Sequence, residues 1–304
     1  MAIPRHLLVD ADTPYCYHIV SRCVRRSWLC GFDRSTRRDY THRKTWLLER
    51  LKLLGGAFSV DVYAYAIMSN HFHLVLYYDP KADEQWTDFD VAERWLSVCP
   101  PKKPDGSVDF ATRELQRQAI LSDPNLLTAL RRKLCSLSVF MKLLKQPIAR
   151  RANLEDECQG HFFEQRFYSC ALLTEQAVIA AMAYVDLNPV RAKIAKTITE
   201  NRHTSIHARL GNNFEPNQLN EYLAPLVTGA GDLTPIRITL GDYIDHLEVV
   251  LPTTKPSWQP DKLDRWRAQV ATLKQRPRAL GSVDILQEWC KRRGWSPREL
   301  TLFG

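Results

Sequence analysis

Residues 64–76 read AYAIMSNHFHLVL, in which two apolar runs meet at Ser69-Asn70, a pair that favours a tight turn. The pattern predicts a β-hairpin with histidines at the first and third positions of its second strand. Because side chains two apart in a strand share a face, His71 and His73 are expected to lie side by side. Such a pair can bind a metal ion, or it can be two polar residues on the solvent-facing side of a sheet.

The segments on either side of this hairpin predict a β-α-β-β-α-β-α order. Runs rich in β-branched and aromatic residues indicate strands, and apolar residues at helical spacing indicate helices. The expected strands span 15–24, 58–68, 71–78 and 160–173, and the expected helices span 37–54, 126–146 and 174–187. This order is typical of a ferredoxin-like α+β fold, in which an antiparallel sheet carries its helices on one face.

The length of 304 residues allows a core domain with additions. The stretch 79–123 contains CPPKKPDGS and predicts a loop-rich insertion. Pro147 is expected to kink or end the helix predicted over 126–146. Beyond about residue 200, helical patterns alternate with links that contain Pro and Gly. We therefore expect one domain over 1–211 and a mostly helical C-terminal extension over 212–304.

The charge pattern is compatible with a polyanionic partner. The chain has 42 Lys and Arg against 34 Asp and Glu, for a net charge of +8. Residues 124–152 hold seven Lys or Arg and no acid, next to the insertion with its ten acids and six bases. The uneven distribution favours a binding face over an evenly solvated surface.

The cysteine and hydropathy patterns concern metal sites and location. None of the eight cysteines forms a CxxC pair, which argues against a zinc ribbon. The N-terminal MAIPRHLLVDAD lacks an apolar signal region, and no stretch approaches the length of a membrane span. We expect a cytoplasmic protein with reduced thiols.

A second group of candidate residues lies in AAMAYVDLNPVRA, residues 180–192, where Tyr184 and Asn188 share a helix face and Arg191 follows one turn later. A phenol with a pKa near 10 is a weak nucleophile, but it becomes effective when a metal ion stabilises the leaving oxygen. Two imidazoles and an amide oxygen leave positions for water and phosphate, which suits Mg²⁺ or Mn²⁺ acting on a phosphodiester. Taken alone, a tyrosine at this position is more often a packing residue than a nucleophile.

The chain resembles the single-tyrosine HUH transposases, above all their REP-associated branch. Three motifs carry the resemblance, in this order: HFH after AYAIMSN, then GHFFEQRF, then AYVDLNPVRAKI. The resemblance implies that His71, His73 and Asn188 hold Mg²⁺ or Mn²⁺, and that Tyr184 is the nucleophile. It implies cleavage of single-stranded DNA to a 5′-phosphotyrosine and a free 3′-OH, followed by strand rejoining. The implied partner is single-stranded DNA, including hairpins or palindromes, bound by a monomer or a homodimer.

Basic residues are candidate DNA contacts, or they can form a solvated face. They are Arg22, Arg25, Arg26, Arg131, Arg132, Lys133, Lys142, Lys145, Arg166 and Arg191. Each phosphate contact to a single strand should steepen the slope of the logarithm of the binding constant against the logarithm of the salt concentration by about 0.7. The resemblance covers about 15–78 and 129–211, so the insertion and the C-terminal extension lie outside it.

Three other functions remain open at this point. The chain can be a non-catalytic single-stranded nucleic-acid-binding protein on the same scaffold, which would bind without Tyr184 or metal. It can be another HUH nuclease of the replication-initiator or relaxase type, although many relaxases use paired tyrosines. A small-molecule metallohydrolase would need more ligands, and no third histidine or carboxylate stands at metal spacing from HFH.

Overall fold

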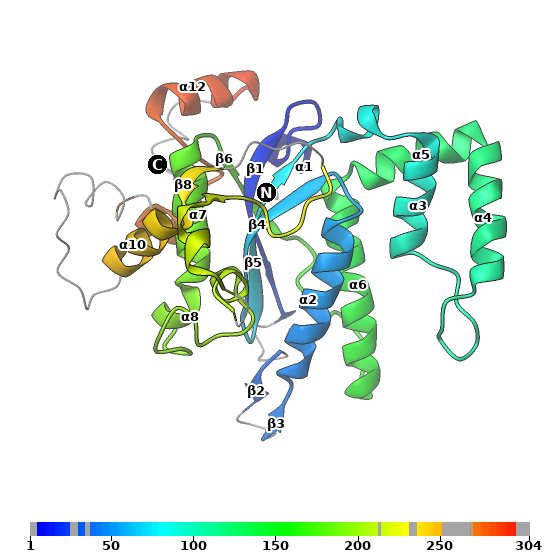
Figure 1. Cartoon of the computed structure of the whole chain (residues 1–304), viewed down its shortest axis with the longest axis horizontal. Coiled ribbons are helices and arrows are strands. Elements are labelled where there is room, and N and C mark those ends of the chain that lie inside the picture. The colour runs from blue at the N-terminus through cyan, green and yellow to red at the C-terminus, as the bar shows by residue number, and fades with distance from the viewer. Residues whose placement is uncertain are drawn as a thin grey trace.

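A five-stranded sheet of order β4-β5-β1-β6-β9 lies at the centre of the computed structural model (Figure 1). The structure describes residues 5–24, 30–33, 37–211, 214–230, 236–250, 268 and 270–295. The strands of the sheet are β1 (Tyr15–Arg22), β4 (Val60–Ile67), β5 (His71–Tyr78), β6 (Tyr168–Leu172) and β9 (Ala279–Leu280). The first three predicted strands are present nearly as expected, whereas the strand predicted over 160–173 is shorter.

The predicted order of strands and helices is present, but the sheet is mixed. β1 lies between β5 and β6 and is antiparallel to both, and β4 pairs with β5 as the predicted hairpin. β9 pairs with β6 in parallel at the edge. The expectation of a purely antiparallel sheet was therefore wrong, because a segment far along the chain returns to this edge.

Helices cover both faces of the sheet, and the expectation of helices on one face was also wrong (Figure 1). α2 (His42–Gly55) and α6 (Leu137–Glu155) pack on one face, and α7 (Glu175–Asp186) covers the other. The physical reason lies in β4, all eight residues of which are buried. A strand buried on both faces has a near-continuous apolar sequence, as in VDVYAYAI, and it needs a second layer of helices.

The expected loop-rich insertion is helical. It contains η2 (Ala82–Gln85), α3 (Asp88–Val98) and α4 (Phe110–Ser122), and α5 (Pro124–Leu134) follows it. Thr87 and Asp90 form a reciprocal capping box at the start of α3, and Asp109 caps α4. These caps are visible in the sequence as T-x-x-D and D-x-x-T, and they were the local signals of helix starts that the prediction of a loop-rich insertion overlooked.

The helix predicted over 126–146 is two helices. α5 ends before Cys135, and Ser136 caps the start of α6 by accepting from the amide of Val139. α6 then continues through Pro147, so the helix does not end there. A proline leaves the carbonyl four residues earlier without its helical partner, and here Arg50 Nε donates to the Leu143 oxygen at 3.2 Å.

The C-terminal extension packs against the core and contains both helices and strands. After α8 (Asn188–Arg191) and α9 (Ser205–Arg209), its described elements are η3 (Pro216–Asn220), β7 (Tyr222–Leu223), β8 (Ile236–Thr239), α10 (Leu240–Val250), η4 (Leu273–Gln275), β9 and α12 (Val283–Arg292). Three short elements, α1 (Arg5–Leu8), β2 (Phe32–Asp33) and β3 (Arg38–Asp39), complete the description. The domain boundary at 211 stays a prediction.

One part of the extension runs directly along β4. The amide of Val62 donates to the Val227 oxygen at 2.8 Å, and Asp61 Oδ1 accepts from the amide of Gly229 at 2.7 Å. A Cβ at Gly229 would lie 2.2 Å from the Gly55 oxygen, so only glycine permits this close approach. The segment around residues 227–229 is therefore fitted closely against the core.

Candidate active site

The two histidines of HFH lie side by side on β5, as predicted, on the face that α7 covers. His73 is buried and His71 is partly buried, and their ring centroids are 4.8 Å apart. In the strand register, His71 is opposite Arg22 and His73 is opposite Val20 of β1. The pair therefore lies beneath α7 and not on a solvent-exposed face of the sheet.

Tyr184 and Asn188 reach the same place from the α7 side. α7 begins at its N-cap Thr174 and ends at Asp186, and Asn188 begins the next helical turn. The Tyr184 ring lies edge-on to the His73 ring with 5.7 Å between centroids. The Asn188 Nδ2 lies 2.9 Å from His73 Nε2. The structure therefore brings all four predicted metal and nucleophile residues together, although their roles stay predictions.

A buried aspartate anchors the end of α7 next to the tyrosine. Asp186 Oδ2 accepts from the Tyr243 hydroxyl at 2.7 Å, and its Oδ1 accepts from the amide of Ile206 at 2.9 Å. Burial raises the pKa of this carboxyl, and hydrogen bonds from Ser205 and Tyr243 oppose that shift. α9 and α10 are thus tied to the helix turn that presents Tyr184.

His18 is a site residue that the sequence interpretation missed. It lies on β1, is buried, and places its Nε2 2.9 Å from His73 Nδ1. The Tyr184 ring is edge-on to His18, with 5.7 Å between centroids. No third histidine stands at metal spacing from HFH in the sequence, and in space His18 lies beside His73 without forming a three-residue metal group among the described residues. The contact between His18 and His73 depends on the pairing of β1 with β5, which no local sequence pattern predicts.

The hydrogen bonds define which imidazole nitrogens are available to a metal ion. His71 Nδ1 donates to Asn70 Oδ1 at 2.6 Å, which leaves its Nε2 unprotonated. With the Asn188 amide nitrogen donating to His73 Nε2, His73 Nδ1 carries the proton and donates to His18. A partner on the second ring nitrogen is the arrangement that metal-binding histidines use.

This donor set fits a divalent ion. Two imidazole nitrogens and the side-chain amide of Asn188 provide a mixed N/O set with room for further oxygen ligands, which suits Mg²⁺ or Mn²⁺. Within the described residues, no group of three or more His, Cys, Asp or Glu side chains is arranged to hold a metal. The amide is therefore essential to this assignment.

The site keeps its histidines neutral. Burial, together with the nearby guanidinium groups of Arg22 and Arg276, lowers the pKa of His71 to about 4. Burial and Arg276 lower the pKa of His18 to about 3, and burial holds the pKa of His73 well below its usual value. Near pH 7 all three imidazoles are therefore neutral, and each has one unprotonated ring nitrogen.

Arginines surround the tyrosine. Burial raises the pKa of Tyr184, and Arg191, Arg22 and Arg276 oppose this shift in that order. The Arg191 guanidinium carbon lies 5.6 Å from the centre of the tyrosine ring, and its Nη1 is buried without a hydrogen-bond partner among the described residues. An uncompensated positive environment of this kind favours a bound anion such as phosphate.

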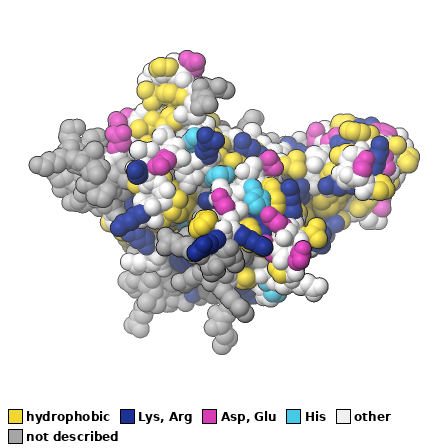
Figure 2. Space-filling model, turned by 90° about the horizontal axis from the view of Figure 1, so that it is seen from below, with side chains coloured by type: hydrophobic (Ala, Val, Ile, Leu, Met, Phe, Trp, Pro, Cys, Tyr) yellow, Lys and Arg dark blue, Asp and Glu magenta, His cyan; other side chains and the backbone are white. Residues whose placement is uncertain are grey.

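The other predicted DNA-binding residues are distributed over separate surfaces. Arg25 and Arg26 lie outside the described residues. Arg131 binds the Trp86 carbonyl and the Asp88 carboxylate, so its guanidinium holds the helical insertion together. The other described basic residues away from the tyrosine have exposed or partly exposed side chains; they are Arg132, Lys133, Lys142, Lys145 and Arg166. Figure 2, seen from below, shows histidine side chains next to Lys and Arg side chains.

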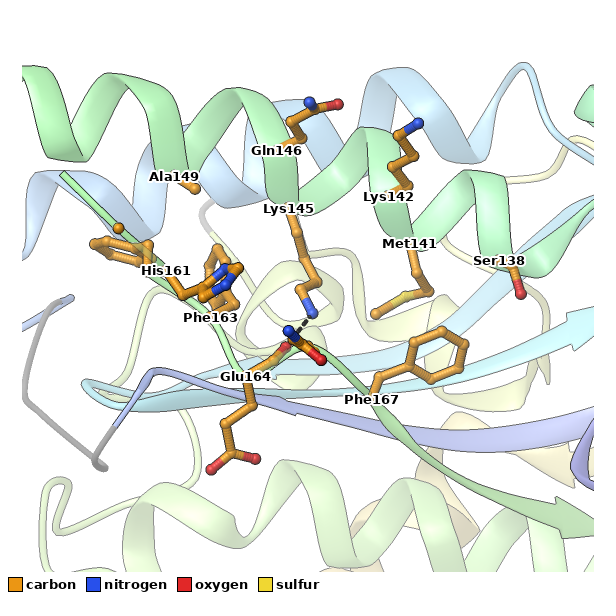
Figure 3. A pocket seen from close by; sticks show the side chains of 13 residues that line it. Ser138, Met141, Lys142, Lys145, Gln146, Ala149, His161, Phe163, Glu164 and Phe167 are labelled. Carbon is orange, nitrogen blue, oxygen red and sulfur yellow. Dashed lines mark hydrogen bonds between the residues drawn. The ribbon is translucent and has the colours of Figure 1, made fainter. Parts of the chain in front are cut away.

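Lys142 and Lys145 line a cavity of about 490 Å³ on the α6 side of the sheet, away from the histidines. Lys145 points into it and donates from Nζ to the Glu164 oxygen at 2.7 Å (Figure 3). Phe163 and Phe167 contribute apolar surface to the same cavity (Figure 3). The structure therefore does not bring these lysines to Tyr184.

Comparisons with known proteins give one distant structural similarity. No family model matches the chain, and no curated protein matches it. The fold is similar to a solved structure described as "Structure of the REP associates tyrosine transposase bound to a REP hairpin", with a TM-score of 0.34 and 11% sequence identity. The similarity covers 72% of this chain and 93% of that one. Because these values describe a distant relationship, the candidate site rests on its geometry.

None of the described helices combines the length and the apolar character that crossing a bilayer requires.

Proposed function

We propose that this chain is a metal-dependent single-strand DNA endonuclease and strand transferase of the HUH transposase type. The observation that carries the proposal is that both Tyr184 and Asn188 contact His73. Their helical segment thereby packs on a strand that lies more than a hundred residues earlier in the chain. A hydroxyl nucleophile, a metal-compatible donor set and a surrounding group of arginines are the parts that phosphodiester cleavage needs.

In this mechanism, His71, His73 and Asn188 would hold Mg²⁺ or Mn²⁺. The ion, when bound, polarises the phosphodiester and stabilises the leaving oxygen. Arg22 and Arg191 bind phosphate oxygens and orient the strand.

The chemical step exchanges one ester for another. The phenolic oxygen of Tyr184 loses its proton to solvent and forms a bond to phosphorus. The bond from phosphorus to the 3′-oxygen breaks, and that oxygen takes up a proton. The products are a 5′-phosphotyrosine and a free 3′-OH, and attack by a 3′-OH on the phosphotyrosine rejoins strands.

The second candidate function is a non-catalytic single-stranded nucleic-acid-binding protein on the same scaffold. It is favoured by one observation, the burial that raises the pKa of Tyr184 and thereby disfavours its phenolate form. Another HUH nuclease, of the replication-initiator or relaxase type, would use the same residues on a different DNA target.

The test is a denaturing gel of 5′- and 3′-labelled single-stranded DNA that includes hairpins from the sequence around the gene. The protein is incubated with Mg²⁺ or Mn²⁺ as wild type, as Tyr184→Phe, and as the matched control Tyr77→Phe on β5. We expect a metal-dependent covalent adduct on the 5′ end of the downstream fragment, absent only in Tyr184→Phe. An adduct in Tyr184→Phe would exclude this nucleophile, and binding without any adduct would support the binding protein.

A further inference from the structure

The C-terminal extension returns to the sheet directly beside the candidate active site. After η4, the chain turns at Arg276 and continues into β9, which pairs with β6. The amide of Ala171 donates to the Arg278 oxygen at 2.9 Å, and the Tyr168 hydroxyl donates to the Pro277 oxygen. The side chain of Tyr168 and the backbone three residues later are thus tied to the segment that carries Arg276.

The side chain of Arg276 lies at the Tyr168 end of the cluster formed by Tyr168, His18 and Tyr184. Its guanidinium carbon lies 6.0 Å from the centre of the Tyr168 ring. That ring is edge-on to His18 at 6.0 Å, and His18 is in turn edge-on to Tyr184 at 5.7 Å. Arg276 is exposed, and it forms no ion pair with any carboxylate among the described residues. Its charge is therefore available to a ligand in the site.

The backbone at Arg276 adopts a left-handed conformation, with φ of 58° and ψ of 59°. This region is costly for residues other than glycine, and it persists where the surroundings hold it in place. Here the amide of Arg276 donates to the Leu273 oxygen at 3.3 Å, and the next residue, Pro277, is held by Tyr168. The turn is stabilised from both sides, and it aims the arginine toward the cluster.

We propose that Arg276 binds a phosphate group of single-stranded DNA beside Tyr184, so that the C-terminal extension completes the active site. The planar guanidinium of arginine matches the oxygens of a phosphodiester and can donate two parallel hydrogen bonds to them. Together with Arg22 and Arg191, it adds to the positive charge near the tyrosine. The inference names a DNA contact of the site in the proposed function and rests on that function for its role in cleavage.

The test separates phosphate binding from cleavage. Binding of fluorescent oligo(dT) of about 16 nucleotides is followed by anisotropy without divalent metal, in a Tyr184→Phe background, from about 50 to 200 mM salt. We compare Arg276→Gln, Arg276→Lys and the control Lys274→Gln, which removes the same charge two residues away on an exposed side chain. Far-ultraviolet circular dichroism and melting temperature verify that each variant is folded.

Arg276→Gln is expected to weaken binding and to reduce the salt slope by about 0.7, while Lys274→Gln leaves both unchanged. Arg276→Lys keeps the charge, and we expect it to retain the slope with weaker binding. Equal slopes for wild type and Arg276→Gln, or equal losses for both glutamine variants, would overturn the inference. If Arg276→Gln loses the phosphate contact but the protein with Tyr184 intact forms no adduct in the gel assay, the inference stands and the endonuclease is excluded.

Discussion

The Nε2 of His18 lies 2.9 Å from the Nδ1 of His73, and the two rings are stacked with only 7° between their planes. The two residues come from adjacent strands that are separated by 55 positions in the sequence. Because His18 accepts from one nitrogen of His73, it leaves the other nitrogen to face Asn188 and a metal ion. His18 is therefore a positioning residue, which acts on the site through His73.

Replacing His18 is expected to weaken metal binding without removing a ligand. His18→Leu should lower Mn²⁺ affinity by about 10-fold or more, the range found when an outer partner of a metal-binding histidine is lost. His18→Gln keeps a side-chain acceptor and should lose less. Titration followed by electron paramagnetic resonance measures this in the absence of DNA. The control is His203→Gln, a histidine outside this cluster, and an unchanged affinity of His18→Leu would refute the positioning role.

The proposed ligands should differ in their effects. His71→Ala and His73→Ala remove imidazole donors, so we expect both to lose metal-dependent cleavage while binding to labelled single strands is retained. Asn188→Ala removes one amide and should lower Mn²⁺ affinity by about 10-fold. Isothermal titration with Mn²⁺ gives the affinities directly. A wild-type titration curve for Asn188→Ala would remove this residue from the ligand set.

Arg50 should stabilise the helix that contains a proline. Its Nε donates to the Leu143 oxygen at 3.2 Å, and its Nη2 donates to the Val98 oxygen at 3.1 Å. Arg50→Met leaves both acceptors without this donor and should lower the free energy of unfolding by about 1–3 kcal/mol, as measured by urea denaturation. In a Pro147→Ala background the loss should be smaller, because the restored amide can bond to Leu143. Identical losses in both backgrounds would contradict this coupling.

The pH dependence of stability should include a contribution from His203. Burial, together with Lys44, lowers the pKa of His203 to about 4, whereas an unfolded histidine titrates near 6.5. Between these values the unfolded chain binds more protons, so this contribution is complete above pH 6.5 and is lost as the pH falls toward 4. His203→Gln should therefore unfold with a shallower pH dependence in this window, as measured by urea denaturation at several pH values. The same slope as wild type would mean that His203 is solvated.

Local patterns were enough to predict several parts of the molecule. Alternation and turn chemistry at Ser69-Asn70 predicted the hairpin, and the same alternation predicted that His71 and His73 share a face. Helical spacing predicted the approach of Tyr184 and Asn188. Each of these features depends on residues within a few positions of one another, where backbone geometry alone determines which side chains are neighbours.

Other parts were decided by tertiary structure. The meeting of His18 with His73 depends on the register of β1 against β5. The position of Arg276 depends on the return of β9 to β6, and the second layer of helices depends on burial of both faces of β4. These contacts join residues far apart in the chain, and their free energy comes from burial and pairing that no local pattern records. Local patterns thus predicted the core order of strands and helices and the candidate nucleophile, whereas the distant side chains that surround it follow from the fold.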